Sequence, residues 1–494
     1  MSNKRARMSS DKAVVDVWQR ELGGLSSRNF AQRLAASEDL VLRLDIYKKL
    51  EEHQGCVNTV SFNADGKSLV SGSDDLQVII WDWETGHAKL SFQSGHADNV
   101  FQARFMPYTD DRSLVTCAAD GEVRHAQILE RGVETRLLAK HQGWAHKLAI
   151  EPGSPHIIYT CGEDGLVQHI DLRTAEATEL FTCYPIDDSR AYMGVINLNA
   201  IAIDPRNPNF FAVAGSDEYT RLYDIRKYKW DGSTDFGQPT DCFCPPHLIG
   251  DGLVRITGLA FSDNSELLAS YHNEFVYLFT RDMGLGHDPA PTSSSACSEA
   301  SQIGLNHSTV SASAVDANDK AIPQVYKGHR NLETVKGVSF FGPRSEYVAS
   351  GSDCGRIFIW KKKSGELVRV MEADKHVVNC IESHPHITVL ASSGIESDIK
   401  IWTPKALNKA ILPTNIEQCK PKPRGWMYRI TSPQDLMLRL LSWQRRGSRP
   451  ERNGENSSEG GEELLDLILT SDTKSDDASS DDGEDASGPD DLFS

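Results

Sequence analysis

The sequence predicts an all-β fold, a seven-bladed β-propeller, and three observations point to it. Residues 53–83 contain three short runs in which apolar residues alternate with small or polar ones, separated by turn residues, which is the pattern of a β-meander. Similar units recur, and three of them open with His53, His96 and His141 at a spacing of about 40–45 residues, the length of one blade. A single sheet of three or four strands cannot bury two apolar faces, so such units pack beside one another in a ring.

Residues 1–40 predict a helical extension ahead of the ring. Apolar residues recur at helical spacing over 14–22, and Ser26 or Ser27 can cap a second helix that carries Phe30 and Leu34. Two interpretations stay open: the helices pack on the ring, or one of them binds in a groove of a partner protein.

Residues 41–48 predict the strand that closes the ring. Leu42, Leu44 and Ile46 alternate with polar residues immediately before the first repeat. An N-terminal strand that completes the last blade leaves no free sheet edge, which is the physical advantage of closure.

Seven repeats then follow in order. In the first, the letters SGSDD and the Trp-Asp pair that ends the third strand resemble a WD40 repeat. The strands of the first repeat are predicted at 57–62, 68–71 and 78–81, and the later repeats at 96–121, 141–173, 200–226, 256–279, 328–360 and 376–402.

Four residues of the first repeat predict a hydrogen-bonded network that joins its strands: His53, Ser71, Asp75 and Trp81. A Ser-His-Asp set also suggests nucleophilic catalysis, but this set recurs from repeat to repeat, so a structural role is expected.

The network is incomplete in other repeats. Ala126 and Ile170 replace the tryptophan, and Glu396 replaces the aspartate. In the sixth repeat Cys354 occupies the aspartate position, and Asp353 stands one residue earlier. We therefore expect those blades to depend on packing more than on the network.

The remaining segments set the predicted domain limits. The propeller spans 41–412 and carries two irregular segments, a long loop at 228–246 and a disordered insertion at about 284–323. A linker with one amphipathic helix is expected at 413–450, followed by an acidic disordered tail at 451–494.

Charge and cysteine content exclude several classes of protein. The net charge is −18, but the tail from 451 to 494 alone has fifteen acidic and two basic residues, so the folded body is only slightly acidic. Direct binding to nucleic acid is therefore not expected. The chain lacks an apolar run long enough to cross a membrane, so no membrane partner is expected.

Neither a metal site nor a catalytic site is predicted. Cys242 and Cys244 form an isolated CxC without a second pair of ligands, so buried thiols are expected rather than zinc, and no cofactor is implied. No Walker motif, GxSxG, HExxH or paired CxxC occurs, which argues against an enzyme. Ten irregularly spaced cysteines indicate a reducing compartment, the cytoplasm or the nucleus. The basic residues at 4–7 are compatible with nuclear import or with an unstructured start.

The strongest functional signal is an Asp-x-Arg sequence at the ends of two consecutive repeats. The third repeat ends with Asp171 and Arg173, and the fourth with Asp224 and Arg226. Neighbouring blades place the two arginines on the same face of the ring. Two rigid, multidentate cations on a flat face suit a protein interface.

Paired Asp-x-Arg boxes resemble the signature of WD40 substrate receptors of cullin-4 RING ubiquitin ligases. The stretches ELGGLSSRNF, SGSDDLQVIIWDW and SGSDCGRIFIW, the insertion and the acidic tail look like the subgroup typified by DNA damage-binding protein 1- and cullin-4-associated factor 8. The likeness covers about residues 14–405. One departure is Ile170, which stands where such a box usually has Trp or Tyr.

The resemblance implies a non-catalytic receptor. Asp171, Arg173, Asp224 and Arg226 would contact the adaptor, DNA damage-binding protein 1, and through it cullin-4 and the RING subunit. An N-terminal helix would add a second contact. The opposite face would hold a protein substrate that the sequence does not identify. The alternative is a WD40 scaffold, or a histone- or chromatin-binding protein, outside any ligase.

Overall fold

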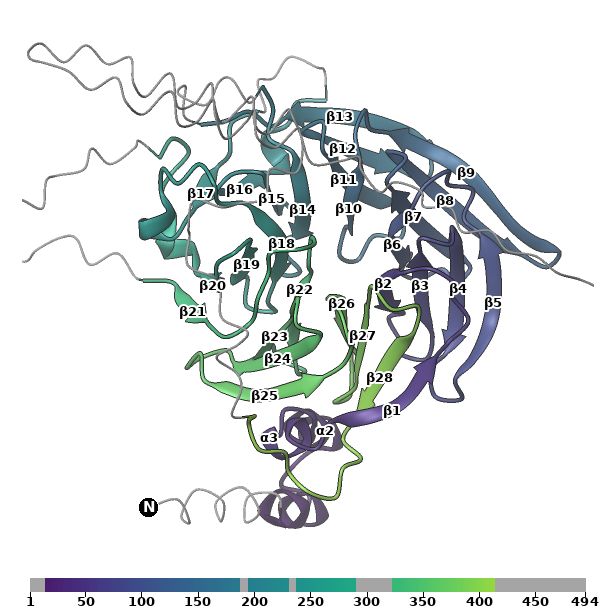
Figure 1. Ribbon diagram of the computed structural model, residues 1–494, viewed down its shortest axis with the longest axis vertical. Helices are drawn as coiled ribbons and strands as arrows, with labels where there is room; N and C mark the ends of the chain where they lie inside the picture. The colour runs from purple at the N-terminus through teal and green to yellow at the C-terminus, as the bar shows by residue number, and fades with distance from the viewer. Residues whose placement is uncertain (1–13, 187–193, 231–236, 290–321, 414–494) are drawn as a thin grey trace, which may run out of the picture. The chain divides into compact units, whose positions relative to one another are not determined.

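The computed structural model describes residues 14–186, 194–230, 237–289 and 322–413 (Figure 1). The expected basic stretch at 4–7, the helix within 413–450, the acidic tail and most of the insertion lie outside the described residues.

The described chain forms seven four-stranded antiparallel sheets, the blades of a propeller (Figure 1). Blades one to three each use four consecutive strands. They are β2 (Val57–Phe62), β3 (Leu69–Ser73), β4 (Gln77–Asp82) and β5 (His87–Gln93); β6 (Val100–Phe105), β7 (Ser113–Ala118), β8 (Glu122–Leu129) and β9 (Gly132–Lys140); and β10 (Ala145–Ile150), β11 (Ile157–Gly162), β12 (Leu166–Asp171) and β13 (Glu176–Thr182).

Blades four to six follow the same order, and blade seven takes three strands from the C-terminal side. They are β14 (Leu198–Ile203), β15 (Phe210–Gly215), β16 (Thr220–Asp224) and β17 (Asp241–Phe243); β18 (Ile256–Phe261), β19 (Leu267–Tyr271), β20 (Val276–Phe279) and β21 (Gln324–Tyr326); β22 (Val338–Phe341), β23 (Tyr347–Gly351), β24 (Arg356–Lys361) and β25 (Leu367–Glu372); and β26 (Val378–Ser383), β27 (Leu390–Gly394) and β28 (Ile399–Thr403).

An N-terminal strand closes the ring, as predicted. Strand β1 (Asp45–Leu50) pairs antiparallel with β28, from Asp45 opposite Thr403 to Leu50 opposite Ile399, and the two lie side by side as purple and yellow-green arrows in Figure 1. The predicted limits of 41–48 are wrong by a few residues. The short helix α3 (Glu38–Val41) precedes the strand, and Leu44 is buried beside it between blades six and seven.

The core consists of apolar clusters, one in each of the seven seams between neighbouring blades. In the seam between blades seven and one, Trp81 is fully buried beside Leu69 and Ile401. Both surfaces of each sheet are therefore covered, which explains why the innermost strands are apolar on both sides.

Strand direction gives the propeller two distinct faces. In each blade the first and third strands run the same way, so the residues before the first strand lie on one face and those after the third strand lie on the other. We call the first the histidine face, after His53, His96 and His141, and the second the arginine face, after Arg173 and Arg226.

The N-terminal helices contact blades six and seven. Residues 14–21 are helical. Ser26 caps α2 (Ser27–Ala35), as predicted, because its side chain accepts a hydrogen bond from the Asn29 amide. The hydroxyls of Tyr347 and Thr388 donate to carbonyls at the end of α2. Tyr347 begins β23 and Thr388 precedes β27, so both lie on the arginine face.

Two irregular segments contain order that the sequence did not suggest. The segment 228–246, expected as a loop, includes β17, the outer strand of blade four. The expected insertion separates β20 from β21 in blade five, and its first residues pack on blade four, where the Leu285 amide donates to the Cys242 carbonyl at 2.8 Å. Among the described residues, we find no helix with the length and apolar character needed to span a bilayer.

Candidate protein-docking site

The network of blade one is buried on the histidine face. His53 Nδ1 lies 2.8 Å from an Asp75 carboxylate oxygen, and His53 Nε2 lies 2.7 Å from Ser71 Oγ, which also accepts from Trp81 Nε1 at 2.8 Å. Burial lowers the pKa of His53, although Asp75 opposes this effect. Every polar atom of the set has a partner within the blade, so the arrangement ties strands together and is enclosed rather than open to a substrate.

The other blades keep part of the network or contain ion pairs in addition to their packed seams. Blades two and three lack the tryptophan but keep the histidine pairs, with His96 Nε2 2.8 Å from Thr116 Oγ1 and His141 Nδ1 3.0 Å from Asp164. In blades four, six and seven, buried ion pairs contribute instead: Arg221 with Asp217, Lys336 with Asp353, and Lys400 with Asp374 and Asp398.

On the arginine face, the box of blade three is a fixed unit at the end of β12. Asp171 accepts from three groups of Arg173: the backbone amide at 2.9 Å, Nε at 3.0 Å and Nη2 at 2.7 Å. The Arg173 guanidinium holds the pKa of the Asp171 carboxyl low, at about 2. The arginine side chain is nevertheless 65% exposed.

The box of blade four has the same geometry at the end of β16. Asp224 accepts from the Arg226 amide at 3.1 Å, from Nε at 2.9 Å and from Nη2 at 2.6 Å. Arg226 has 58% of its side chain exposed, whereas its aspartate is largely covered. In both boxes the carboxylate therefore caps the turn and orients a guanidinium whose remaining N–H groups face solvent.

The residue before each box differs between the two blades. Tyr223 in blade four stacks on Phe181 at 4.2 Å between ring centroids and on Phe211 at 5.6 Å. Ile170 in blade three is fully buried in the seam with blade two. The aliphatic residue thus fills the same inward position, and the box beyond it keeps its geometry.

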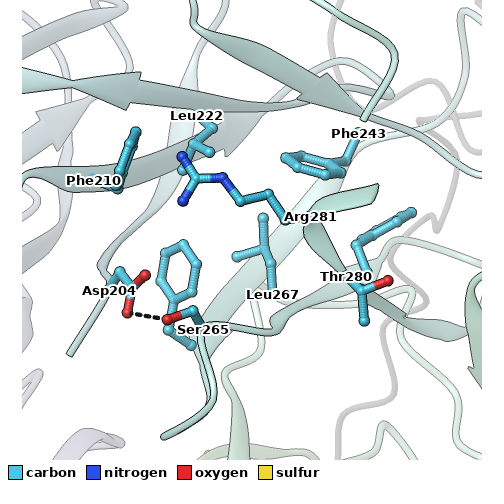
Figure 2. A pocket seen from close by; sticks show the side chains of 10 residues that line it. Asp204, Phe210, Leu222, Phe243, Ser265, Leu267, Thr280 and Arg281 are labelled. Atoms are coloured by element: carbon cyan, nitrogen blue, oxygen red, sulfur yellow. Dashed lines mark hydrogen bonds between the residues drawn. The ribbon is translucent and has the colours of Figure 1, made fainter. Parts of the chain in front are cut away.

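A third arginine on this face was missed at the sequence level. Arg281, just after β20 in blade five, lies with its guanidinium carbon 4.0 Å from the centre of the Phe210 ring, and that of Arg226 lies 5.5 Å from the same ring. Arg281 and Phe210 both line a cavity of about 20 Å³. Figure 2 shows Arg281 reaching toward Phe210, with the Asp204–Ser265 hydrogen bond below it. Within the described residues, Arg281 forms no ion pair.

A wider groove adjoins Arg173 between blades two and three. Its volume is about 540 Å³, and polar side chains of both blades line it, including His125, Arg136 and His156. Arg136 Nη2 donates to the Leu172 carbonyl inside the box at 3.2 Å, which ties the wall of the groove to the box. The arginine face thus presents exposed cations over blades three to five beside a groove that can receive a protruding segment.

The cysteines of the CxC sequence lie away from this face. Cys242 and Cys244 are buried in the apolar seam between blades four and five, and burial raises the pKa of the Cys242 thiol to about 12. Such thiols are weak metal ligands because they remain protonated at neutral pH.

Comparisons with known proteins agree with the propeller. The family model described as "WD domain, G-beta repeat" matches residues 45–82 and 321–361. Among solved structures, the β-propeller domain of Cps50 (Swd1) from Myceliophteria thermophila aligns with a TM-score of 0.52 and 20% identity, over 73% of this chain and 99% of that one. At this identity the likeness concerns the fold alone.

Curated proteins give a more specific likeness. The chain is 32% identical to mouse DDB1- and CUL4-associated factor 6, over 53% of this chain and 31% of that protein. It is also 32% identical to Protein ALTERED SEED GERMINATION 2 of Arabidopsis thaliana, over 52% of this chain and 38% of that protein. It therefore spans about a third of the length of these relatives. Human WD and tetratricopeptide repeats protein 1 is 22% identical over 92% of this chain and 99% of that protein. The chain is thus a seven-bladed β-propeller with WD40 repeats and with homology to DDB1- and CUL4-associated factor 6.

Proposed function

We propose that the protein is a non-catalytic substrate receptor of a cullin-4 RING ubiquitin ligase. In this proposal it binds the adaptor, DNA damage-binding protein 1, through its arginine face. It belongs with the subgroup typified by DNA damage-binding protein 1- and cullin-4-associated factor 8. The observation that carries the proposal is the pair of oriented, exposed arginines, Arg173 and Arg226, at the ends of the third strands of adjacent blades. The relatives named DDB1- and CUL4-associated factor support the same partner.

The mechanism is proximity rather than chemistry. Bound to the adaptor, the receptor would hold a protein substrate near the conjugating enzyme that the RING subunit recruits. The second encounter then becomes intramolecular, and the effective concentration of lysines on the substrate rises without new bonds being made or broken by this chain.

The N-terminal helices supply a second contact in this proposal. An ion pair of 2.7 Å between Arg33 and Asp16 and a cation–π contact of 4.7 Å between Arg20 and Phe30 hold the two helices together. Their outer side exposes apolar residues, among them Trp18, which is 59% exposed. A helix pair that rests on the ring and exposes its apolar face can bind in a groove of the adaptor.

The proposed location is the nucleus or the cytoplasm. The eight cysteines in the described parts of the chain are free, which suits a reducing compartment.

The test is co-precipitation of adaptor and cullin with the wild-type chain and with Arg173→Ala/Arg226→Ala. Lys375→Ala, an exposed cation on the histidine face, is the control. We expect retention by wild type and control, loss in the double variant, and equal melting temperatures for all three. If the wild-type chain fails to retain the adaptor, the scaffold or histone-binding alternative replaces the proposal.

A further inference from the structure

Three aromatic rings meet on the histidine face at the seam between blades two and three. Phe101 stacks on His146 with ring centroids 5.2 Å apart and planes at 13°, and Trp144 lies 5.6 Å from Phe101 and 5.7 Å from His146. Trp144 is 47% exposed. We call Phe101, Trp144 and His146 the aromatic cluster; it uses none of the residues of the adaptor site.

The ring does not require aromatic residues at these positions. Phe101 and His146 each occupy a β-bulge just after the first residue of an innermost strand, and Asn58, Asn199 and Asn379 occupy the same bulge in blades one, four and seven. Bulges re-aim side chains.

Two of those asparagines bond to the neighbouring blade. Asn58 Nδ2 donates to the Val100 carbonyl at 3.2 Å, and Asn199 Nδ2 donates to the Ile256 carbonyl at 3.0 Å. Blades two and three replace this structural amide with the half-buried Phe101 and the buried His146, which pack against the exposed Trp144. An exposed ring supported by two further rings points to a binding role.

The cluster is held rigidly. The Glu163 amide donates to the Trp144 carbonyl at 3.0 Å, and the Glu163 carboxylate lies 3.3 Å from His146 Nε2. Gly143 and Gly162 flank the loop so closely that a Cβ on either would fall within 2.8 Å of a neighbouring atom. The backbone that carries Trp144 and His146 is therefore fixed before a ligand binds.

Two carboxylates accompany the cluster, and the half-buried Lys147 follows His146 on β10. Glu163 is half-buried at its edge, and Asp98 is exposed in the loop that leads into β6. Among the described residues, neither carboxylate forms an ion pair with a lysine or an arginine. Aromatic faces beside unneutralised carboxylates attract a cation.

We propose that the aromatic cluster and Glu163 bind a lysine or arginine side chain of a protein segment. The cation would lie against the Trp144 face, and Glu163 would supply the opposite charge. If the arginine face binds the adaptor, the histidine face stays free for a substrate. The statement that this segment belongs to a substrate therefore rests on the proposed function. The binding itself does not depend on it.

The probes are four peptides, acetyl-Gly-Gly-X-Gly-Gly-amide, in which X is Arg, Lys, norleucine or Glu. They are titrated into the full-length protein labelled with 5-fluorotryptophan, and the Trp144 fluorine resonance is assigned by its loss in Trp144→Phe. We expect the Arg and Lys peptides to shift this resonance, the norleucine peptide to bind about 3- to 30-fold more weakly, as cation–π energies imply, and the Glu peptide to have no effect.

Variants separate binding from folding. Phe101→Asn and His146→Asn introduce the asparagine that other blades have at this position, so both variants should fold. Both should bind the Arg peptide more weakly than the wild type does, as should Glu163→Gln. Trp230→Leu, an exposed tryptophan on the arginine face, should leave the titration unchanged. Equal binding of the norleucine peptide, or no shift of the Trp144 resonance by any cationic peptide, would overturn the proposal. Adaptor co-precipitation should be unaffected by these variants, so the two proposals fail separately.

Discussion

Asp224 and Arg226 form a two-point ion pair on the arginine face, in which Nη2 lies 2.6 Å and Nε 2.9 Å from the two carboxylate oxygens. The aspartate also accepts the Arg226 amide and so fixes the turn that carries the side chain. Asp224 thus determines how the Arg226 guanidinium is oriented and partly balances its charge.

The box predicts different effects for its two members. Arg226→Ala should lower adaptor affinity by about 30-fold, the loss typical of a hot-spot arginine. Asp224→Asn keeps the cation but loosens it, so a smaller loss of about fivefold is expected. Arg226→Lys should not restore binding, because an ammonium cannot form the fork. Biolayer interferometry measures all three; full affinity in Arg226→Lys would show that charge alone suffices.

Arg281 should extend the adaptor surface to blade five. Arg281→Gln removes an exposed cation that rests on Phe210, and we expect adaptor affinity to fall about three- to tenfold, which corresponds to the loss of a contact of about 1 kcal/mol. The melting temperature should stay unchanged, since the guanidinium covers the ring from outside. Lys375→Ala is the matched surface control. Unaltered affinity would confine the adaptor site to blades three and four.

Trp81 should be the costliest single truncation in blade one. Trp81→Ala removes a fully buried indole and leaves Ser71 Oγ without its donor, so the free energy of unfolding should fall by about 3–5 kcal/mol. Urea denaturation followed by circular dichroism measures the change. Trp230→Ala, at an exposed site, should cost little. A loss below about 1 kcal/mol for Trp81→Ala would mean that the seam repacks.

His329 should make the protein sensitive to acid. It is fully buried, neither ring nitrogen has a hydrogen-bond partner within the described chain, and burial lowers its pKa to about 4. The folded state therefore favours the neutral ring, so stability is complete above the unfolded pKa of 6.5 and falls as the pH drops from 6.5 toward 4. The loss can reach about 3 kcal/mol. Across this range His329→Leu should show a shallower decline in urea midpoint; identical slopes would refute the assignment.

Closure by β1 predicts a sharp difference between two truncations. Removal of residues 1–36 takes away the outer helices and should lower the melting temperature modestly. Removal of residues 1–50 also deletes β1 and exposes the edge of β28, so aggregation is expected. Size-exclusion chromatography distinguishes the two. A monomeric, folded chain without residues 1–50 would show that the ring does not need its closing strand.

Much of the fold was accessible from the sequence because the inner strands alternate clearly. Strand β2 occupies the predicted 57–62, and blade five was located despite its divergent turn. The outer strands of blades one to six were not predicted. Strand β5 has alternating exposed and half-buried residues without a strong apolar pattern, and β17 is three residues long within a polar segment. Leu44 was assigned to the wrong element because a buried leucine after a short helix looks like the start of a strand.

The candidate site was predictable only where it is local in sequence. Asp171 and Arg173 stand two apart, and so do Asp224 and Arg226, so spacing alone suggested the pairs. Arg281 stands one place earlier in blade five than Arg226 does in blade four, and it has no paired aspartate. Its cation–π contact with Phe210 forms between two blades. The buried pair of Lys336 and Asp353 was missed for the same reason.

The closing strand also constrains how the ring is made during translation. β1 leaves the ribosome before every other strand of the propeller, and its partner β28 is the last of these strands. At about 5–20 residues per second the interval between them is on the order of tens of seconds. For that time β1 cannot pair with β28. The nascent chain is an incomplete propeller with one unpaired strand. Until synthesis reaches the last blade, β1 is therefore a strand that can pair with other chains.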